Sequence, residues 1–175
     1  MGSEMCIRDS IIEHAGGYGV YAPECDLSIY NSTIKNCDKD AIHFRSGKSL
    51  ILRDSILENC GGGLIYKYWA DKDAIIERNI IRNNGGSGID IYLYGRGDDA
   101  FIEDNIIKNN TGDGIKCKGL YTISAKIINN TVSCGGNGVY LDDVRRANIT
   151  GLIICLLYTS PSPRDLSTSR MPSSA

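Results

Sequence analysis

Apolar residues recur through the middle of the chain in columns with a period near 24 residues. The spacings between successive members of the first column are 23, 24, 26, 25 and 22 residues. The five columns are Ile29, Leu52, Ile76, Ile102, Ile127 and Ile149; Ile34, Leu57, Ile81, Ile107, Val132 and Ile154; Ile42, Leu64, Ile89, Ile115 and Val139; Phe44, Tyr66, Ile91, Cys117 and Leu141; and Leu27, Leu50, Ala74, Ala100, Ala125 and Ala147. A fixed period of this length is the signature of a stacked repeat.

Within each repeat the apolar residues alternate with polar ones, as in the pairs Ile89 and Ile91 or Ala74 and Ile76. A period of two is typical of β-strands, whose successive side chains point to opposite faces. The alternating stretches are short, so we expect strands of three to five residues. A helical repeat is excluded, because Gly-Gly and Asn-Asn pairs recur in the units and disfavour helices.

Small polar residues fill the intervals between the predicted strands. One turn column holds Ser32, Ser55, Asn79, Asn105 and Asn130, a second holds Asn36, Asn59, Asn83 and Asn109, and a third holds Gly63, Gly88, Gly114 and Gly138. Asparagine and glycine tolerate the left-handed backbone conformations that sharp turns require. Three strands and three turns per repeat predict one coil of a parallel β-helix, with coils about 4.8 Å apart.

The repeat pattern x-I-x-x-N-x-I-x-x-N followed by G-I resembles the right-handed parallel β-helix of the pectin-lyase-like superfamily. The resemblance covers Ile11–Ile154 and implies an all-β solenoid of about five full coils and two partial ones. The superfamily contains polysaccharide lyases, glycoside hydrolases, uronate epimerases, phage tailspikes and adhesins. The fold alone does not choose among them.

The two ends differ in composition from this middle part. All three Met residues and three of the four Pro residues lie in residues 1–10 and 155–175. The opening "MGSEMCIRDS" resembles a translated transposase-end sequencing adapter, and the closing segment resembles its reverse complement. We therefore expect residues 1–10 and 155–175 to be adapter-derived and either to pack poorly or to attach as improvised structure. Residues 11–154 are expected to be an internal β-helix fragment that lacks its native N-terminus.

Charge and hydropathy narrow the function classes. The chain carries a formal net charge of −2, which does not suggest affinity for nucleic acid. Its apolar runs are far shorter than the roughly 20 residues of a membrane span, so we expect no such span in the fragment.

In carbohydrate-active members of the superfamily, the resemblance implies a groove on the outer face of the strand that follows the glycine. Two outward rows are predicted there: Tyr21, His43, Ile65, Asp90, Lys116 and Tyr140; and Arg45, Lys67, Tyr92, Lys118 and Asp142. The neighbouring like charges of Arg45 and Lys67 are unfavourable unless an anion lies over them. A polymer of uronic acids would supply such anions.

Candidate roles follow from this chemistry. Lys116 or His43 could abstract a proton next to a uronate carboxyl group, and Asp90 could orient or perturb that base. The candidate substrate-binding residues are Arg45, Lys67, Tyr92, Lys118 and Tyr140. The alternative is an ordinary solvated sheet face in which Asp90 and Lys116 form a cross-strand ion pair. The Asp pairs of glycoside hydrolases and the Asp-Pro-His-Asp of alginate epimerases are not found, so no catalytic residue is transferred from a family.

Metal chemistry has weak support in the sequence. The acidic pairs Asp98–Asp99 and Asp142–Asp143 offer oxygen ligands that suit Ca²⁺, so a calcium site is an open alternative and no metal ligand is assigned. Cys37 and Cys60 share a column and are therefore expected to be neighbours, either as a disulfide or as two thiols.

Two functions from different classes remain open. The first is a secreted, cell-surface or periplasmic protein that binds or processes an acidic polysaccharide, as a lyase or epimerase would. The second is a structural or adhesive shaft without chemistry of its own. In either case the neighbouring coils of a longer parent chain are expected partners.

Overall fold

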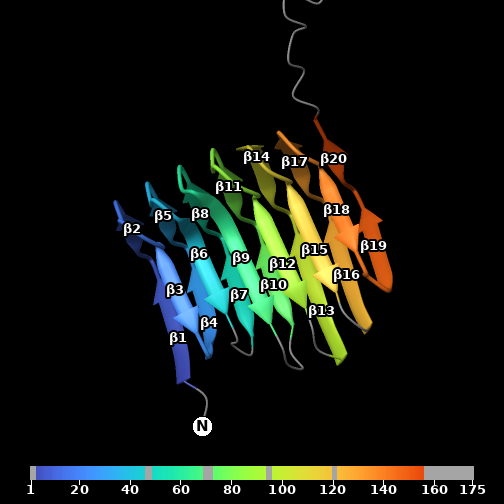
Figure 1. The fold of residues 1–175 in the computed structure, drawn as a ribbon, viewed down its shortest axis with the longest axis horizontal. Coiled ribbons are helices and arrows are strands. Elements are labelled where there is room, and N and C mark those ends of the chain that lie inside the picture. The colour runs from blue at the N-terminus through green and yellow to red at the C-terminus, as the bar shows by residue number, and fades with distance from the viewer. Residues whose placement is uncertain (1–2, 46–48, 69–72, 94–95, 120–121, 156–175) are drawn as a thin grey trace, which may run out of the picture.

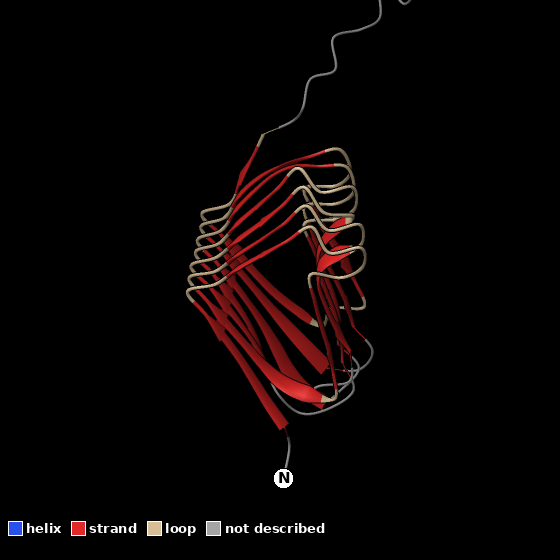
Figure 2. Cartoon of the chain, turned by 90° about the vertical axis from the view of Figure 1, so that its left-hand side faces the viewer, coloured by secondary structure: helices blue, strands red, loops and turns tan. Residues whose placement is uncertain are grey.

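The computed structural model describes residues 3–45, 49–68, 73–93, 96–119 and 122–155. These residues form twenty β-strands and no helix. Successive coils stack side by side along one long axis, with the N-terminal coil at one end (Figure 1). Viewed along that axis, three walls surround the interior (Figure 2). Buried apolar side chains fill this interior. The predicted right-handed parallel β-helix is confirmed.

Each wall is one parallel sheet. Sheet A contains β1 (Ser3–Arg8), β4 (Cys25–Tyr30), β7 (Leu50–Arg53), β10 (Ala74–Glu77), β13 (Arg96–Glu103), β16 (Thr122–Ile128) and β19 (Arg146–Thr150). Sheet B contains β2 (Ile11–Glu13), β5 (Thr33–Lys35), β8 (Ile56–Glu58), β11 (Ile80–Arg82), β14 (Ile106–Asn110), β17 (Thr131–Cys134) and β20 (Ile153–Ile154). Sheet C contains β3 (Val20–Pro23), β6 (Asp40–Arg45), β9 (Gly62–Tyr68), β12 (Ile89–Leu93), β15 (Ile115–Gly119) and β18 (Val139–Asp142).

The five predicted apolar columns point into the interior of the solenoid. Ile76 pairs with Leu52 on one side and with Ile102 on the other, and all three are fully buried. The columns become exposed at the C-terminal coil, where Ile149 and Ile154 are 41% and 49% exposed. Stacking like residues therefore builds the core, and a coil without a neighbour leaves its apolar face uncovered.

The turn from sheet A to sheet B carries a ladder of buried polar side chains. The backbone N–H of Ser55 donates to Oδ1 of Asn79 at 2.9 Å, and the N–H of Asn79 donates to Oδ1 of Asn105 at 2.9 Å. Asn105 continues the ladder to Asn130 at 3.0 Å. The left-handed residue of this turn is the one before the ladder position, such as Arg78 with φ of 54°. The ladder side chains are thus selected for hydrogen bonding rather than for backbone freedom.

A second ladder follows the turn from sheet B to sheet C. The predicted left-handed asparagines are found there, with φ of 55° at Asn109 for example. The next residue in each turn points inward, and the N–H of Cys60 donates to Oδ1 of Asn84 at 3.0 Å. Cys37 occupies the same column, and its N–H donates to Sγ of Cys60 at 3.4 Å. Both cysteines are free thiols, so the disulfide alternative is not found.

The glycine column before sheet C reflects close packing between coils. A Cβ atom at Gly88 would lie 2.6 Å from Cγ2 of Ile107 and 2.8 Å from the carbonyl oxygen of Gly114. Real Cβ atoms do not approach neighbours this closely. A side chain at this position would therefore push two adjacent coils apart, and only glycine fits.

The N-terminal segment adds an edge strand to sheet A. Ser3–Arg8 pairs in register with β4, and Ile7 lies beside Ile29 and is partly buried against the core. Five of the six side chains of β1 are nevertheless exposed. An edge strand offers unpaired backbone groups to any segment with suitable alternation. As a result, β1, β2 and β3 complete a coil that the sequence counted as partial, and residues 156–175 lie outside the described structure.

Candidate functional site

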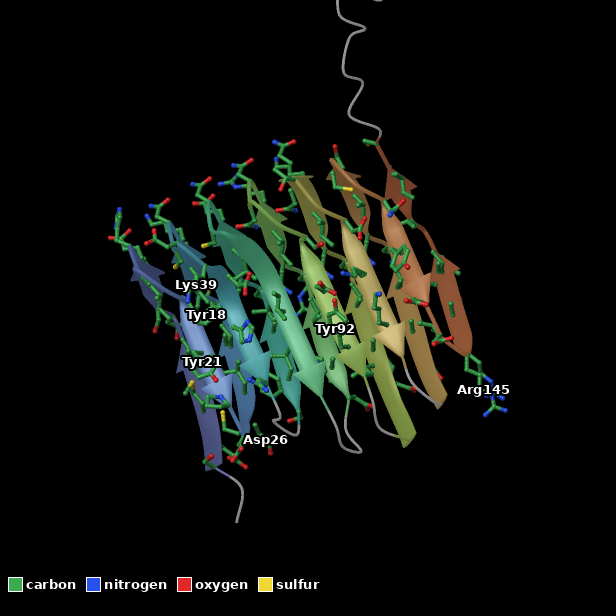
Figure 3. The ribbon with its side chains drawn as sticks, viewed as in Figure 1. Tyr18, Tyr21, Asp26, Lys39, Tyr92 and Arg145 are labelled. Atoms are coloured by element: carbon green, nitrogen blue, oxygen red, sulfur yellow. The ribbon has the colours of Figure 1, made fainter. Side chains whose placement is uncertain are left out.

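Sheet C presents the two predicted outward rows. The register pairs His43 with Tyr21 and with Ile65, and Asp90 with Ile65 and with Lys116. The second row runs through Arg45, Lys67, Tyr92, Lys118 and Asp142. The sheet C face is visible in Figure 3, where Tyr18 and Tyr21 mark its N-terminal end and Tyr92 its middle.

Asp90, Tyr92 and Lys116 form a hydrogen-bonded cluster between β12 and β15. Nζ of Lys116 lies 3.1 Å from Oδ2 of Asp90 and donates to the hydroxyl of Tyr92 at 3.2 Å. The hydroxyl of Tyr92 lies 3.5 Å from the same Asp90 oxygen. The side chains of Lys116 and Asp90 are 20% and 14% exposed. The cross-strand ion pair considered from the sequence is therefore present, and it is largely buried.

The surroundings of Lys116 disfavour its candidate role as a base. Burial alone would lower the pKa of Lys116, but its hydrogen bonds with Tyr92 and Asp90 and the charge of Asp90 outweigh burial and raise that pKa. A general base must be unprotonated at the working pH. Lys116 is therefore a permanent cation near neutral pH, which suits it to an electrostatic role.

Lys118 and Tyr140 form a second group at the C-terminal end of the face. Nζ of Lys118 lies 3.1 Å from Oδ2 of Asp142, and it lies 5.6 Å from the centre of the Tyr140 ring. The hydrogen bond with Asp142 raises the pKa of Lys118. The Lys118 and Asp142 side chains are 35% and 44% exposed, so solvent screens this pair.

Arg45 lies at the other end of the second row. It is exposed, and together with Tyr21, Pro23 and Glu24 it lines a surface hollow of about 200 Å³. The backbone register places Arg45 directly beside Lys67, as the sequence predicts. The side chain of Lys67 lies outside the described structure.

His43 is not close to Asp90, the residue proposed to orient it. Ile65 stands between them in the row, so two strand spacings, or about 10 Å, separate their positions. His43 instead contacts Asp40, with Nδ1 of the imidazole 3.1 Å from Oδ2 of the carboxylate. The structure therefore divides the proposed catalytic set into two groups.

Aromatic rings surround His43. The Tyr18 ring centre lies 4.4 Å from that of His43, and the Tyr21 ring centre lies 5.8 Å away. Tyr18 belongs to the turn before β3, and Nζ of Lys39 lies 5.1 Å from its ring centre. The imidazole is thus enclosed by side chains from two successive coils.

The sequence missed Asp40 and Tyr18 for identifiable reasons. Strict alternation places residues 40 and 43 on opposite faces of a strand. Ala41 and Ile42 are both fully buried, so the alternation of β6 is broken at its start and Asp40 reaches the same face as His43. Tyr18 lies in a turn, where periodicity gives no direction. The positions equivalent to Tyr18 in the later coils, such as Gly62 and Ser87, are not aromatic, so no repeated pattern marks it.

Among the described residues, no group of three or more His, Cys, Asp or Glu side chains is arranged to hold a metal ion. Asp142 is paired with Lys118, and the side chain of Asp98 lies outside the described structure. Burial raises the pKa of the Cys117 thiol to about 12, which makes it a packing residue rather than a ligand or nucleophile. Within the same described residues, no helix is long and apolar enough to span a membrane.

Comparison with curated proteins and with solved structures gives no significant match. A family model described as "Right handed beta helix region" matches residues 2–152, which is most of the chain. This match agrees with the three parallel sheets and the stacked columns of the solenoid. The chain therefore belongs to the right-handed β-helix family.

Proposed function

We propose that the sheet C face binds an acidic polysaccharide rich in uronic acids, in an extracellular, cell-surface or periplasmic protein related to the pectin-lyase-like superfamily. The observation that carries the proposal is the in-register pairing of Arg45 with Lys67. Like charges directly opposite each other on neighbouring strands are destabilising. An anionic polymer lying across the strands would remove this cost.

The residues around this pair suit a sugar chain. Tyr92 follows Lys67 in the same row, and Tyr21 lines the hollow beside Arg45. Tyrosine presents an apolar ring with a polar end, a combination that suits a surface of both CH groups and hydroxyls. The face therefore combines cations for carboxylates with rings for sugar faces.

Two of the other cations on this face are already paired. Lys116 is held by Asp90 in a largely buried pair, whereas Lys118 and Asp142 form a partly exposed one. Exposed pairs contribute about 0–1 kcal/mol, so Lys118 can exchange its partner for a ligand carboxylate at small cost. Arg45 and Lys67, rather than Lys116, are accordingly the main anion-binding candidates.

A binding titration tests the proposal. The chain is titrated with polygalacturonate, alginate and a neutral glucan, at about 50 mM and about 300 mM salt. We expect binding to the two acidic polymers only, and weaker binding at the higher salt. Arg45→Glu should weaken it at least tenfold. Lys108→Glu is the matched control on sheet B and should leave binding unchanged. Equal binding to all three polymers, or none to the acidic ones, would refute the proposal.

A charge-neutralising pair of variants sharpens this test. Asp142→Asn frees Lys118 and should tighten binding of the acidic polymer severalfold. Asp143→Asn makes the same chemical change at the next residue, where φ is 55° and asparagine is well tolerated. If both variants raise affinity equally, net charge rather than a site explains the binding.

The second candidate is a structural or adhesive shaft. The closed Asp90–Tyr92–Lys116 cluster favours it, because a satisfied ion pair stabilises a sheet without any ligand. Under this alternative none of the three polymers binds, and Lys116→Met lowers stability alone.

A further inference from the structure

We infer that this chain binds a second copy of itself head to tail, so that the coils of one copy continue into the next as an open filament. The first coil contains β1, β2 and β3, and the last described coil contains β18, β19 and β20. These two coils lie at opposite ends of the stack (Figure 1). The inference needs no ligand and is independent of the proposed polysaccharide.

Each end of the stack carries an edge strand from all three sheets. The two edges of sheet A are β1 and β19, those of sheet B are β2 and β20, and those of sheet C are β3 and β18. An edge strand presents backbone N–H and C=O groups that can pair with a strand of another chain. The first coil of a second copy therefore supplies one matching strand to each sheet of the last described coil.

The inward apolar columns continue across this junction. Extending the register of sheet A places Ile149 beside Ile7 of the second copy. Extending the register of sheet B places Ile154 beside Ile12 of the second copy. Ile149 and Ile154 are 41% and 49% exposed, whereas the members of the same columns one coil further in are fully buried. A second copy thus gives the last coil the apolar cover that every inner coil already has.

The hydrogen-bond ladder at the turn from sheet A to sheet B fits the same junction. Within the stack, the hydroxyl of Ser32 donates to the carbonyl of Tyr30 at 2.7 Å and accepts from the N–H of Ser10 at 3.2 Å. The hydroxyl of Ser10 makes the same donation, to the carbonyl of Arg8 at 2.7 Å. It is therefore oriented to accept from a preceding coil. The register places the N–H of Leu152 at that position when a preceding copy is present.

The outer face agrees with this register. In sheet A, Arg146 lies beside Glu4 of the second copy, and opposite charges on neighbouring strands are favourable. Asp143 and Glu24 of the second copy bring like charges together at the turns that follow β18 and β3. Both residues are exposed, so solvent and salt screen their repulsion.

The junction leads to a filament rather than to a closed dimer. It uses different surfaces on the two copies, and a contact of this kind gives a ring or an open chain according to the rotation between copies. The coils of this molecule follow one another along a single axis (Figure 1). A second copy that continues the stack therefore extends the same axis and leaves its own last coil free for a third copy.

Disulfide trapping tests the predicted register. Extending sheet A places Asn148 beside Cys6 of the second copy at about 4.8 Å, which is within the range of a disulfide. Asn148→Cys, in a Cys155→Ser background, is incubated with oxidised glutathione at rising protein concentration. We expect dimers, trimers and longer species on a non-reducing gel, because each junction becomes covalent.

Lys126→Cys in the same background is the matched control. Lys126 pairs with Asn148 in the same outward row, one coil further in, so it lies about 10 Å from Cys6 of the second copy. A disulfide cannot span Cα atoms more than about 7 Å apart. We therefore expect at least tenfold less crosslinked product from this variant. Both variants are first checked for wild-type circular dichroism.

Electron microscopy of the wild-type chain without oxidant gives a second readout, and we expect unbranched filaments. Equal crosslinking of the two cysteine variants would overturn the inference, because it would mean that copies meet without a fixed register. A monomeric chain that gives neither crosslinks nor filaments would also overturn it. Since no polysaccharide is present in these experiments, either result leaves the proposed function standing.

Discussion

At the residue scale, each repeat position has its own physical requirement. The A-to-B ladder accepts serine or asparagine, because either side chain can accept from the backbone N–H of the preceding coil. Asparagine does more, since Nδ2 of Asn105 also donates to the carbonyl of Ile76 at 2.9 Å. The ladder thus satisfies backbone groups that the turn removes from the sheets.

Asn105→Ala should be strongly destabilising for this reason. It removes the acceptor of the Asn79 N–H and the donor to Ile76, in a site that is 1% exposed. Each of these two buried unsatisfied groups costs about 1–3 kcal/mol, so we expect a loss of about 2–6 kcal/mol in urea unfolding. Asn105→Ser keeps one acceptor and should cost clearly less. Equal losses would show that cavity formation, not the ladder, dominates.

Substitutions at Ile76 and Ile75 test the predicted register of β10, because the two isoleucines lie on opposite faces of the same strand. Ile76 is fully buried, whereas Ile75 points outward on the same strand. Ile76→Asp buries an unpaired charge and should abolish cooperative unfolding, and Ile76→Ala should cost about 2–5 kcal/mol. Ile75→Ala should cost less than about 1.5 kcal/mol. Denaturation curves of the three variants measure this, and the reverse order would mean that the register is shifted by one.

At the element scale, parallel in-register strands bring residues one coil apart into contact. Charges of opposite sign therefore meet across strands, as between Arg53 and Glu77 at 2.9 Å or between Arg82 and Glu58 at 2.7 Å. Like charges also meet in register, as Arg45 with Lys67 on sheet C and Arg82 with Lys108 on sheet B. Arg82 is already paired with Glu58, and the rows of sheet C combine their cations with tyrosine rings, so sheet C is the candidate binding face.

The Lys116 cluster predicts a loss of stability at alkaline pH. Because its folded-state pKa is raised above the ordinary value, protonated Lys116 stabilises the fold below about pH 10, and this contribution is lost as pH rises through the folded pKa. The stability difference between wild type and Lys116→Met should thus stay constant up to about pH 10 and shrink as the pH rises through the raised folded-state pKa of Lys116. Urea unfolding measures it. In an Asp90→Asn background the pH dependence should weaken, and an unchanged slope would assign it to another group.

At the scale of the whole molecule, the last coil of the described residues leaves its inward apolar columns partly exposed, with Ile149 41% and Ile154 49% exposed. Exposed apolar groups beside unpaired strand edges favour association with another chain.

We expect the chain to self-associate through these coil ends as its concentration rises. Ile149→Lys should lower the mass average measured by light scattering, because a charge would interrupt the apolar end. Ile106→Lys is the matched control, since Ile106 is 43% exposed but lies on the side of the stack. If Ile106→Lys is the more effective variant, association is lateral. A strictly monomeric wild type at high concentration would contradict the prediction.

The sequence by itself determined the coil, the inward columns and the two outward rows. These features recur in every coil, so each position can be checked against its equivalents in the other repeats. Ile76 and Asn105 could therefore be placed from spacing alone. Sequence also anticipated the Asp90–Lys116 pair, because a column predicts neighbours one coil apart. The length of the stack was less certain, since β1 joins the sheet through its backbone rather than through a repeat motif.

Only the tertiary structure decided which functional groups meet. Asp40 reaches His43 because β6 breaks its alternation at Ala41 and Ile42, and Tyr18 covers His43 from a turn whose direction no periodicity gives. In the structure, His43 and Asp90 also lie two strands apart, with Ile65 between them. The repeat spacing predicts the position of each backbone segment within a coil. It does not predict which way a turn side chain points, so contacts between a turn and a strand are known only from the three-dimensional structure.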